Sequence, residues 1–317
     1  MTAALASYVR ILGRGANLSR SLTDVEAEEA MEIILKGEAA PEAVGALLLL
    51  LRMKGETAEE IAGFVRAARA HIRAEGTVAL DWPSYAAGRT RGLPWFLLSA
   101  KLVAGAGYPV LLHGWNSHQN PIASVRAALP MLNIPVIETP EFGNLAHGIG
   151  YLPLETLSAP LFNLLNLRDV LGVRSCINTV LRVLNPTGAA ASVQGVFHPP
   201  YRELQMDAAM LLKQPSMTVL KGGGGEFERN PAKDIALFGL RDGQAWTDTA
   251  AAKANTHTRL AEGVEASDPS ALAALWTGAL DDGFALNIVL GTADLALQTL
   301  GATETAADLW AQRNRTL

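Results

Sequence analysis

Residues 96–112, FLLSAKLVAGAGYPVLL, place a helical pattern directly before a short apolar run. Phe96 to Ala106 has the length and composition of a helix, and Pro109 to Leu112 is typical of a buried strand. Downstream, residues 122–129 are again helical, and Val136 and Ile137 start another short strand. Helices that alternate with short buried strands indicate a parallel sheet with helical crossovers. The stretch therefore predicts an α/β fold.

The first 75 residues are helical by their periodicity. Thr23 is a candidate cap for one helix, Pro41 opens a second that ends at Gly55, and Thr57 caps a third, with Glu60 in place for a capping box. Three short helices bury little apolar surface by themselves, so we expect them to pack against another layer or a second subunit. The apolar run Ala46–Leu51 favours a homodimer.

These patterns predict two units. Residues 1–76 form a small all-helical dimerisation domain, and residues 77–317 form a large α/β domain with a mainly parallel central sheet flanked by helices. A helix over about residues 156–171 would return to the helical domain. The alanine-rich last 70 residues are expected to be helical.

Composition narrows the class of protein. A chain of 317 residues that is 49% hydrophobic and 18% charged can bury a large core, and a net charge of −5 disfavours a strongly basic nucleic-acid binder, although a local basic groove is compatible with it. Cys176 is the only cysteine, which excludes an intramolecular disulfide. The longest apolar run is far shorter than the ~20 residues of a membrane span. No signal-peptide pattern opens the sequence, so we expect a cytoplasmic protein with no membrane partner.

A second informative stretch is residues 219–231, VLKGGGGEFERNP. Met217 to Leu220 is typical of a buried strand, and four glycines (Gly222, Gly223, Gly224 and Gly225) follow Lys221 at its end. Glycine loops at strand ends can present backbone N–H groups to an anion, and Lys221 would add a charge. The loop lacks the Walker A and dinucleotide-binding spacings, so a plain turn is the alternative.

Four stretches together resemble the anthranilate phosphoribosyltransferase-like proteins of glycosyltransferase family 3. They are GEAAPEAVGALLLLLRMKGETAEEIAGFVRAAR, YPVLLHGWNSHQNPIASVRAALPMLNIPV, RDVLGVRSCINTVLRVLNP and GVFHPPYRELQMDAAMLLKQPSMTVLKGGGGEFE. The third is the most specific, because its arginine, glycine and asparagine spacings all agree with the family. The departures described below resemble the second, divergent type of these proteins.

The first departure is in the loop that holds pyrophosphate in the family's working enzymes, Gly-Thr-Gly-Gly-Asp. The corresponding region here is LDWPSYAAGRTRGLPW, with Gly88 and no aspartate in the loop. Arg89 and Arg91 could take over phosphate binding; a solvated loop, or contacts to a polynucleotide backbone, are the alternatives.

The second departure is in the family's Lys-His-Gly-Asn motif. Leu112 replaces the lysine, His113 and Gly114 remain, and Asn116 is displaced by Trp115. His113 would either donate to a ligand oxygen or lie satisfied in the core. Trp82, Trp95 and Trp115 would either stack on a ligand ring or belong to the core.

The third departure is in the family's magnesium-binding Asp-Glu pair, which is Glu226 and Glu228 here, separated by Phe227. The resemblance implies Mg²⁺ as a cofactor at these two residues. It also places Arg168 on the arginine that meets the aromatic acid's carboxylate; an ion pair with Asp169 or Glu155 is its structural alternative.

Two classes of function remain open at this point. The first is a pentosyltransferase of unknown acceptor that binds phosphoribosyl pyrophosphate or another phosphate-bearing ligand between the domains. The second is a non-catalytic protein on the same fold that binds nucleic acid, because fold alone does not determine function. In either class we expect anthranilate phosphoribosyltransferase activity to be absent or weak.

Overall fold

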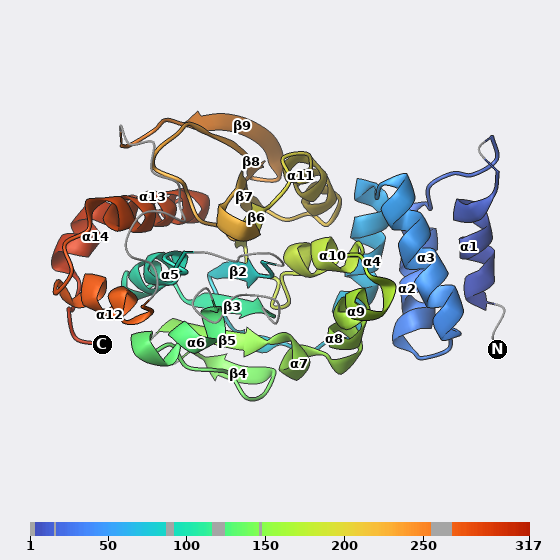
Figure 1. Cartoon of the computed structure of the whole chain (residues 1–317), viewed down its shortest axis with the longest axis horizontal. Helices are drawn as coiled ribbons and strands as arrows, with labels where there is room; N and C mark the ends of the chain where they lie inside the picture. Colours follow the sequence, from blue (N-terminus) through green and yellow to red (C-terminus); the bar gives the residue numbers. More distant parts are fainter. Residues whose placement is uncertain (1–3, 16, 87–91, 116–123, 146–147, 255–267) are drawn as a thin grey trace.

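A computed structural model describes the chain except residues 1–3, 16, 87–91, 116–123, 146–147 and 255–267. Helices gather at the N-terminal end of the molecule, and an α/β unit makes up the rest (Figure 1). This is the predicted fold class. The N-terminal helices are α1 (Ala4–Gly13), α2 (Asp24–Leu35), α3 (Pro41–Lys54) and α4 (Ala58–Ala70).

The caps of these helices explain their boundaries. Thr57 accepts a hydrogen bond from the Glu60 amide while the Glu60 side chain accepts from the Thr57 amide, which is the predicted capping box. Thr23 forms a second capping box with Glu26 at the start of α2. Gly55 ends α3 with a φ of 84°, a left-handed conformation that glycine adopts without steric cost.

Seven strands form the central sheet in the order β5-β3-β2-β6-β7-β8-β9. The first five are mutually parallel, and β8 and β9 add an antiparallel hairpin at one edge. The central strands are β2 (Leu80–Ser84), β3 (Val110–Gly114), β5 (Ile149–Pro153), β6 (Ala191–Val196), β7 (Ser216–Lys221), β8 (Ile235–Arg241) and β9 (Gln244–Ala250). A separate two-stranded parallel sheet pairs β1 (Glu75–Thr77) with β4 (Glu141–Asn144).

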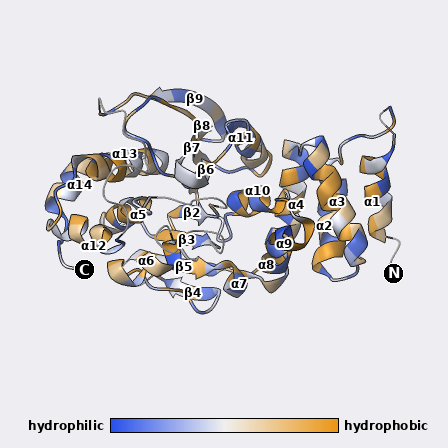
Figure 2. Ribbon diagram, in the orientation of Figure 1, coloured by the Kyte–Doolittle hydropathy of each residue, from blue (hydrophilic) through white to orange (hydrophobic). Residues whose placement is uncertain are grey.

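Helices cover both faces of the sheet. On one side α13 packs on α5, β6 and β7, and on the other α10 and α11 pack against α4 of the N-terminal helices (Figure 1). The helices of the α/β unit are α5 (Phe96–Gly105), α6 (Val125–Ala128), α7 (Leu154–Leu157), α8 (Ala159–Asn166), α9 (Arg168–Leu171), α10 (Ile177–Val183), α11 (Tyr201–Leu211), α12 (Ser270–Thr277), α13 (Gly283–Leu300) and α14 (Ala306–Gln312), with 3₁₀ turns η2 (Pro130–Leu132) and η4 (Gly223–Gly225). Figure 2 shows the mixed polar and apolar faces of the N-terminal helices and the largely apolar strands β3 and β5.

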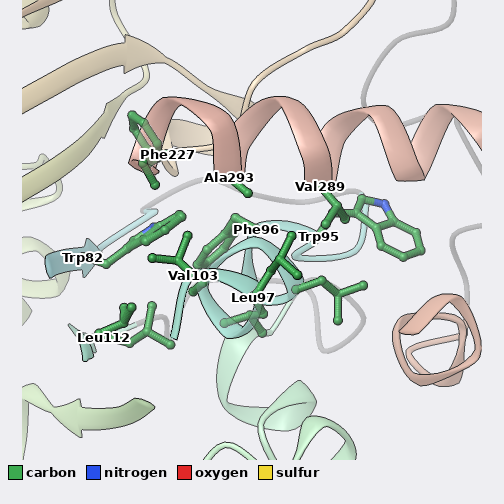
Figure 3. Packing of buried hydrophobic residues seen from close by; sticks show 14 of the residues in the cluster. Trp82, Trp95, Phe96, Leu97, Val103, Leu112, Phe227, Val289 and Ala293 are labelled. Atoms are coloured by element: carbon green, nitrogen blue, oxygen red, sulfur yellow. The ribbon is translucent and has the colours of Figure 1, made fainter. Parts of the chain in front are cut away.

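The core has two clusters of buried residues, one on each side of the sheet. The first is built around α5 and α13, where Trp82 packs against both Phe96 and Phe227 and the cluster includes Val289 and Ala293 of α13 (Figure 3). The second joins α1–α4 to α7, α8, α10 and α11. Burial of this apolar surface is the main stabilising term for the fold.

Two local expectations differ from the structure. Val136 and Ile137 do not begin a strand; Val136 makes only an isolated bridge to Tyr151, and the next strand in the chain is β4. The helix expected near residues 156–171 is split into α7, α8 and α9. Ser158 is extended (φ −164°) and caps α8 through its hydroxyl, which accepts a hydrogen bond from the Leu161 amide and prevents one continuous helix.

Helix α13 is the only described helix long and apolar enough to cross a membrane by length and composition. Ten of its residues are buried, because it packs against α5 and against strands β6 and β7. Its apolar character is accounted for by this position in the core.

Candidate functional site

The carboxyl ends of four parallel strands meet at one edge of the sheet. Ser84 at the end of β2 pairs with Gly114 of β3, and Val196 at the end of β6 pairs with Lys221 of β7. Ligands of open α/β sheets bind at this edge. The predicted His-Gly motif and glycine run are therefore brought to one side of the molecule, and the segment that replaces the pyrophosphate loop starts there.

The glycine run packs tightly against the residues that follow it. A Cβ atom at Gly222 would overlap the carbonyl oxygen of Glu226, and Gly224 and Gly225 have φ values of 65° and 93°. The Gly222 amide donates to the Val196 carbonyl and the Gly225 amide to the Gly222 carbonyl, both at 3.2 Å. These two N–H groups are therefore engaged within the protein. Glycine is therefore needed here, first of all, so that the loop can adopt this backbone conformation.

Glu226 and Glu228 point into the protein, and neither is exposed. The Oε1 atom of Glu226 accepts hydrogen bonds from the Ser84 hydroxyl (2.9 Å) and the Ala86 amide (3.1 Å). The Oε2 atom of Glu228 accepts from the Phe96 amide at the start of α5 (3.0 Å). The two carboxylates thus tie the loop after β7 to the end of β2 and to α5.

A small cavity of about 70 Å³ opens where the N-terminal helices meet the α/β unit. Three arginines reach it from different elements: Arg52 from α3, Arg174 from the segment before α10, and Arg182 from α10. We call this cavity the arginine pocket; its lining is Arg52, Arg174, Ser175, Asn178, Thr179, Arg182, Val196, Phe197, His198, Tyr201 and Gly224. None of these described lining residues is acidic.

The arginines perturb one another. Burial lowers the pKa of Arg174, and the positive charges of Arg168 and Arg52 lower it further. Burial also lowers the pKa of Arg182 to about 10, while the Glu226 carboxylate acts in the opposite direction. Like charges held this close create a positive potential, which an anion in the pocket would relieve.

Arg182 is positioned by neutral partners. Its Nη1 donates to the Asn178 side chain (2.7 Å) and its Nη2 to the Tyr85 carbonyl (2.8 Å). The Asn178 amide also donates to the Tyr85 carbonyl (3.2 Å). Ser84 and Ala86, which flank Tyr85, both donate hydrogen bonds to the Glu226 carboxylate. The turn after β2 therefore links Glu226 to Arg182 in one hydrogen-bonded assembly.

His113 lies beneath this assembly and is not exposed. Its Nδ1 is 3.0 Å from the Tyr85 hydroxyl, and its Nε2 is 3.1 Å from Asp81 Oδ1, an ion-pair distance without hydrogen-bond alignment. The second Asp81 oxygen accepts from the Ser192 hydroxyl (2.8 Å). Of the two interpretations of His113, its burial and the contact of its Nδ1 with Tyr85 favour a place in the core. At Gly114 a Cβ would overlap the Ser84 carbonyl oxygen, so close strand packing requires glycine.

The other predicted ligand residues fall in different places. Lys221 is exposed at the end of β7 and does not line the arginine pocket. Arg168 Nε lies 3.7 Å from Asp169 Oδ1, which is the ion pair named above as the alternative to ligand binding. The charge of Arg168 also lowers the pKa of Arg174 in the pocket. Gly224 is the one predicted glycine in the described lining. Gly88, Arg89, Arg91 and Asn116 lie outside the described residues.

Trp82 and Trp95 belong to the core and cannot stack on a ligand ring, because both are fully buried. Trp82 stacks on Phe96 with centroids 6.1 Å apart and meets the edge of Phe227 at 5.4 Å (Figure 3). Glu226, Phe227 and Glu228 form what we call the EFE segment. Phe227 anchors this segment in the core, while Glu226 accepts hydrogen bonds from the end of β2 and Glu228 accepts one from the start of α5.

Arg52, Arg182 and Tyr201 are pocket residues that sequence reasoning did not assign. A usable signal existed for Arg182, because an arginine inside the apolar run TVLRVL must find partners when the helix is buried. Arg52 carried no such signal, since an arginine in the last turn of a helix is ordinary. Its position depends on how α3 meets α11, where it lies 3.4 Å from the Tyr201 hydroxyl.

Comparison with known proteins relates the chain to the glycosyltransferases. Residues 6–72 match the glycosyl transferase family, helical bundle domain. Over 98% of its length the chain superimposes on anthranilate phosphoribosyltransferase from Thermus thermophilus (TM-score 0.77, 23% identity, 93% of that chain). It also superimposes on the Saccharomyces cerevisiae enzyme in complex with PRPP and Mg (TM-score 0.75, 15% identity, 98% of this chain and 92% of that chain).

Sequence comparison gives the particular family. The chain is 31% identical to anthranilate phosphoribosyltransferase of Rhizobium rhizogenes over 233 residues, which are 71% of this chain and 68% of that protein. The enzyme of Hyphomonas neptunium is 33% identical over 202 residues, 61% of this chain and 57% of that protein. The chain belongs to the anthranilate phosphoribosyltransferase family.

Proposed function

We propose that this protein is a pentosyltransferase homologue of unknown acceptor, and that the arginine pocket holds a phosphate group of a ligand of the phosphoribosyl class. One observation carries the proposal: Arg52, Arg174 and Arg182 reach one cavity that has no acidic residue in its described lining. Guanidinium groups bind phosphate through charge-assisted, often bidentate hydrogen bonds. The relative from yeast, with PRPP in its complex, supports this ligand class.

A magnesium ion at Glu226 and Glu228 does not fit the arrangement of these residues. Mg²⁺ in phosphate sites keeps several waters and binds through one or two carboxylates beside the substrate. Here both side chains are fully buried, and each accepts hydrogen bonds from the chain's own donors. Within the described ranges no three His, Cys, Asp or Glu side chains group as metal ligands. We therefore propose that the arginines supply the charge that neutralises phosphate.

The test is calorimetric titration with phosphoribosyl pyrophosphate of the wild type and of Arg52→Gln and Arg174→Gln. Each substitution removes a charged hydrogen-bond donor, so each should weaken binding about tenfold or more. Arg10→Gln is the matched control, because Arg10 is exposed on α1 and does not line the pocket. Equal affinities in all four proteins would refute the assignment.

A polynucleotide is the second candidate ligand, and Phe197 favours it. This side chain lines the arginine pocket, is 46% exposed, and has its ring 4.8 Å from that of His198. An exposed aromatic ring beside phosphate ligands can stack on a base. If an oligonucleotide is the ligand, its affinity should fall steeply as the salt concentration rises. The slope of log affinity against log salt concentration should flatten by about 1 for each lost arginine contact, and Phe197→Ala should weaken oligonucleotide binding.

The proposal includes three further expectations, on localisation, oligomeric state and anthranilate transfer. We expect a cytoplasmic protein, a homodimer, and anthranilate transfer that is absent or weak. The exchange of the family's Asp-Glu pair for an inward-facing EFE segment supports the last point, because transfer needs stabilisation of the leaving pyrophosphate. The helical unit over residues 1–76, joined by α8 and α9 near residues 156–171, is proposed as the dimerisation domain.

A further inference from the structure

A second and larger cavity, of about 1050 Å³, lies at the far end of the α/β unit from the arginine pocket. It is open to solvent on one side and is lined by the C-terminal half of α5, the turn η2, helices α12 and α14 and the segment after α14. Figure 1 shows these C-terminal helices at the opposite end of the molecule from α1–α3. We call it the distal cavity. Its volume is that of a small-molecule site.

The walls of the distal cavity are held in place by hydrogen bonds. Lys101 Nζ donates to the Leu132 carbonyl (2.7 Å), which ties α5 to η2. Trp276 Nε1 donates to the Asn314 carbonyl (3.0 Å), and Arg313 donates to the Trp276 carbonyl (3.0 and 2.8 Å), which ties the last segment to α12. The cavity is therefore a formed feature of the fold.

The chemistry of the lining combines apolar surface with positive charge. Leu102, Ile134 and Leu309 line it together with Trp276. The Lys101 ammonium lies 5.4 Å from the centre of the Trp276 ring, and the Arg313 guanidinium lies 5.6 Å from the same ring. Burial lowers the pKa of both cations, and the hydrogen bonds described above join both to neutral carbonyls.

No acidic side chain is among the described residues that line the cavity. Two half-buried cations beside apolar walls disfavour a cationic ligand and favour an anion that brings its own apolar part. We propose that the distal cavity is a second ligand site for a small amphiphilic anion, with the anionic group at Lys101 and Arg313 and the apolar part along Leu102, Ile134 and Leu309. This site is independent of the function proposed for the arginine pocket.

The probe is decanoate, titrated into the full chain in a calorimeter, with decan-1-ol and decyltrimethylammonium as neutral and cationic analogues of equal chain length. Decanoate should bind at least tenfold more tightly than either analogue, because only it gains charge-assisted hydrogen bonds. Lys101→Met should remove that preference while leaving decan-1-ol binding unchanged. Equal binding of the three probes, or none, would overturn the proposal.

A blocking variant locates the site. Gly105 lines the distal cavity, and a Cβ built there meets nothing within 4 Å, so the backbone admits a side chain here and Gly105→Phe is designed to fill the cavity. It should abolish decanoate binding. Gly283→Phe is the matched control, because Gly283 also faces open space and does not line the cavity. Decanoate binding that persists in Gly105→Phe would place the probe elsewhere and refute the site.

Discussion

At the scale of single residues, the decisive feature is the direction of two carboxylates. Glu226 and Glu228 stand where the family resemblance implies metal ligands, yet both are buried and accept hydrogen bonds from Ser84, Ala86 and Phe96. A carboxylate that accepts buried amide and hydroxyl donors contributes to stability, because removing it takes an acceptor away from those donors.

Replacement of Glu226 should therefore act on stability. We predict that Glu226→Ala lowers the free energy of unfolding by about 2 kcal/mol, because the buried Ala86 amide and Ser84 hydroxyl lose their acceptor. Urea unfolding with and without magnesium measures this, and Glu203→Ala on the exposed side of α11 is the control. A stability loss seen only when magnesium is present would instead indicate a metal ligand.

A second residue-scale prediction concerns acid. The hydrogen bond from Arg20 lowers the pKa of Glu26 from its ordinary 4.5 to about 2. Because the unfolded chain binds this proton first, the contribution of Glu26 is complete above pH 4.5 and is lost as the pH falls towards 2. Arg20→Gln should therefore lose less stability between about pH 5 and pH 3 than the wild type. Urea midpoints at the two pH values measure this, and identical losses would contradict it.

At the scale of elements, the glycine loop is defined by close backbone contacts. Gly195 on β6 lies against the loop so closely that a Cβ would overlap the backbone of Glu226 and Phe227. Glycine is therefore required at both sides of this contact, at Gly195 and at Gly222.

We predict that Gly195→Ala destabilises the protein by about 2–3 kcal/mol, because backbone atoms must move to admit the methyl group. Gly105→Ala is the matched control: its Cβ would meet open space, and it should leave stability unchanged or raise it by about 0.5 kcal/mol. Chemical denaturation compares the two. An unchanged midpoint for Gly195→Ala would show that the loop packs less closely.

Elements with local signals could be predicted from the sequence, and those that depend on distant contacts could not. The capped helices α2, α3 and α4 were predictable because their caps and periodicity are local. The hairpin of β8 and β9 was missed although Asp242 and Gly243, both with positive φ, mark its turn. The direction of Glu226 and the meeting of Arg52 with Arg182 depend on tertiary packing, which no local pattern encodes.

At the scale of the whole molecule, an apolar surface on the N-terminal side supports the proposed homodimer. Leu49 and Met53 on α3 are 37% and 84% exposed, and Val170 on α9 is 81% exposed. A Cβ at Gly45 would lie 3.5 Å from Leu171, which places α3 beside α9. Exposed apolar side chains gathered on two neighbouring helices are typical of a protein interface.

We predict a dimer at micromolar concentration by light scattering. Met53→Glu combined with Val170→Glu should give a monomer with unchanged circular dichroism, because both side chains are exposed within one chain and charge disfavours the core of an interface. Leu18→Glu, at another exposed apolar position, is the control. A wild-type monomer would contradict the proposal.

The most direct test of the central claim, that arginines and not a metal at the EFE segment hold the phosphate, is calorimetric titration of the wild type with phosphoribosyl pyrophosphate in EDTA. We predict that binding occurs without a divalent cation, because Arg52, Arg174 and Arg182 supply the positive charge in the pocket. Absence of binding in EDTA with binding restored by magnesium would contradict the account, because it would require carboxylates that face the ligand.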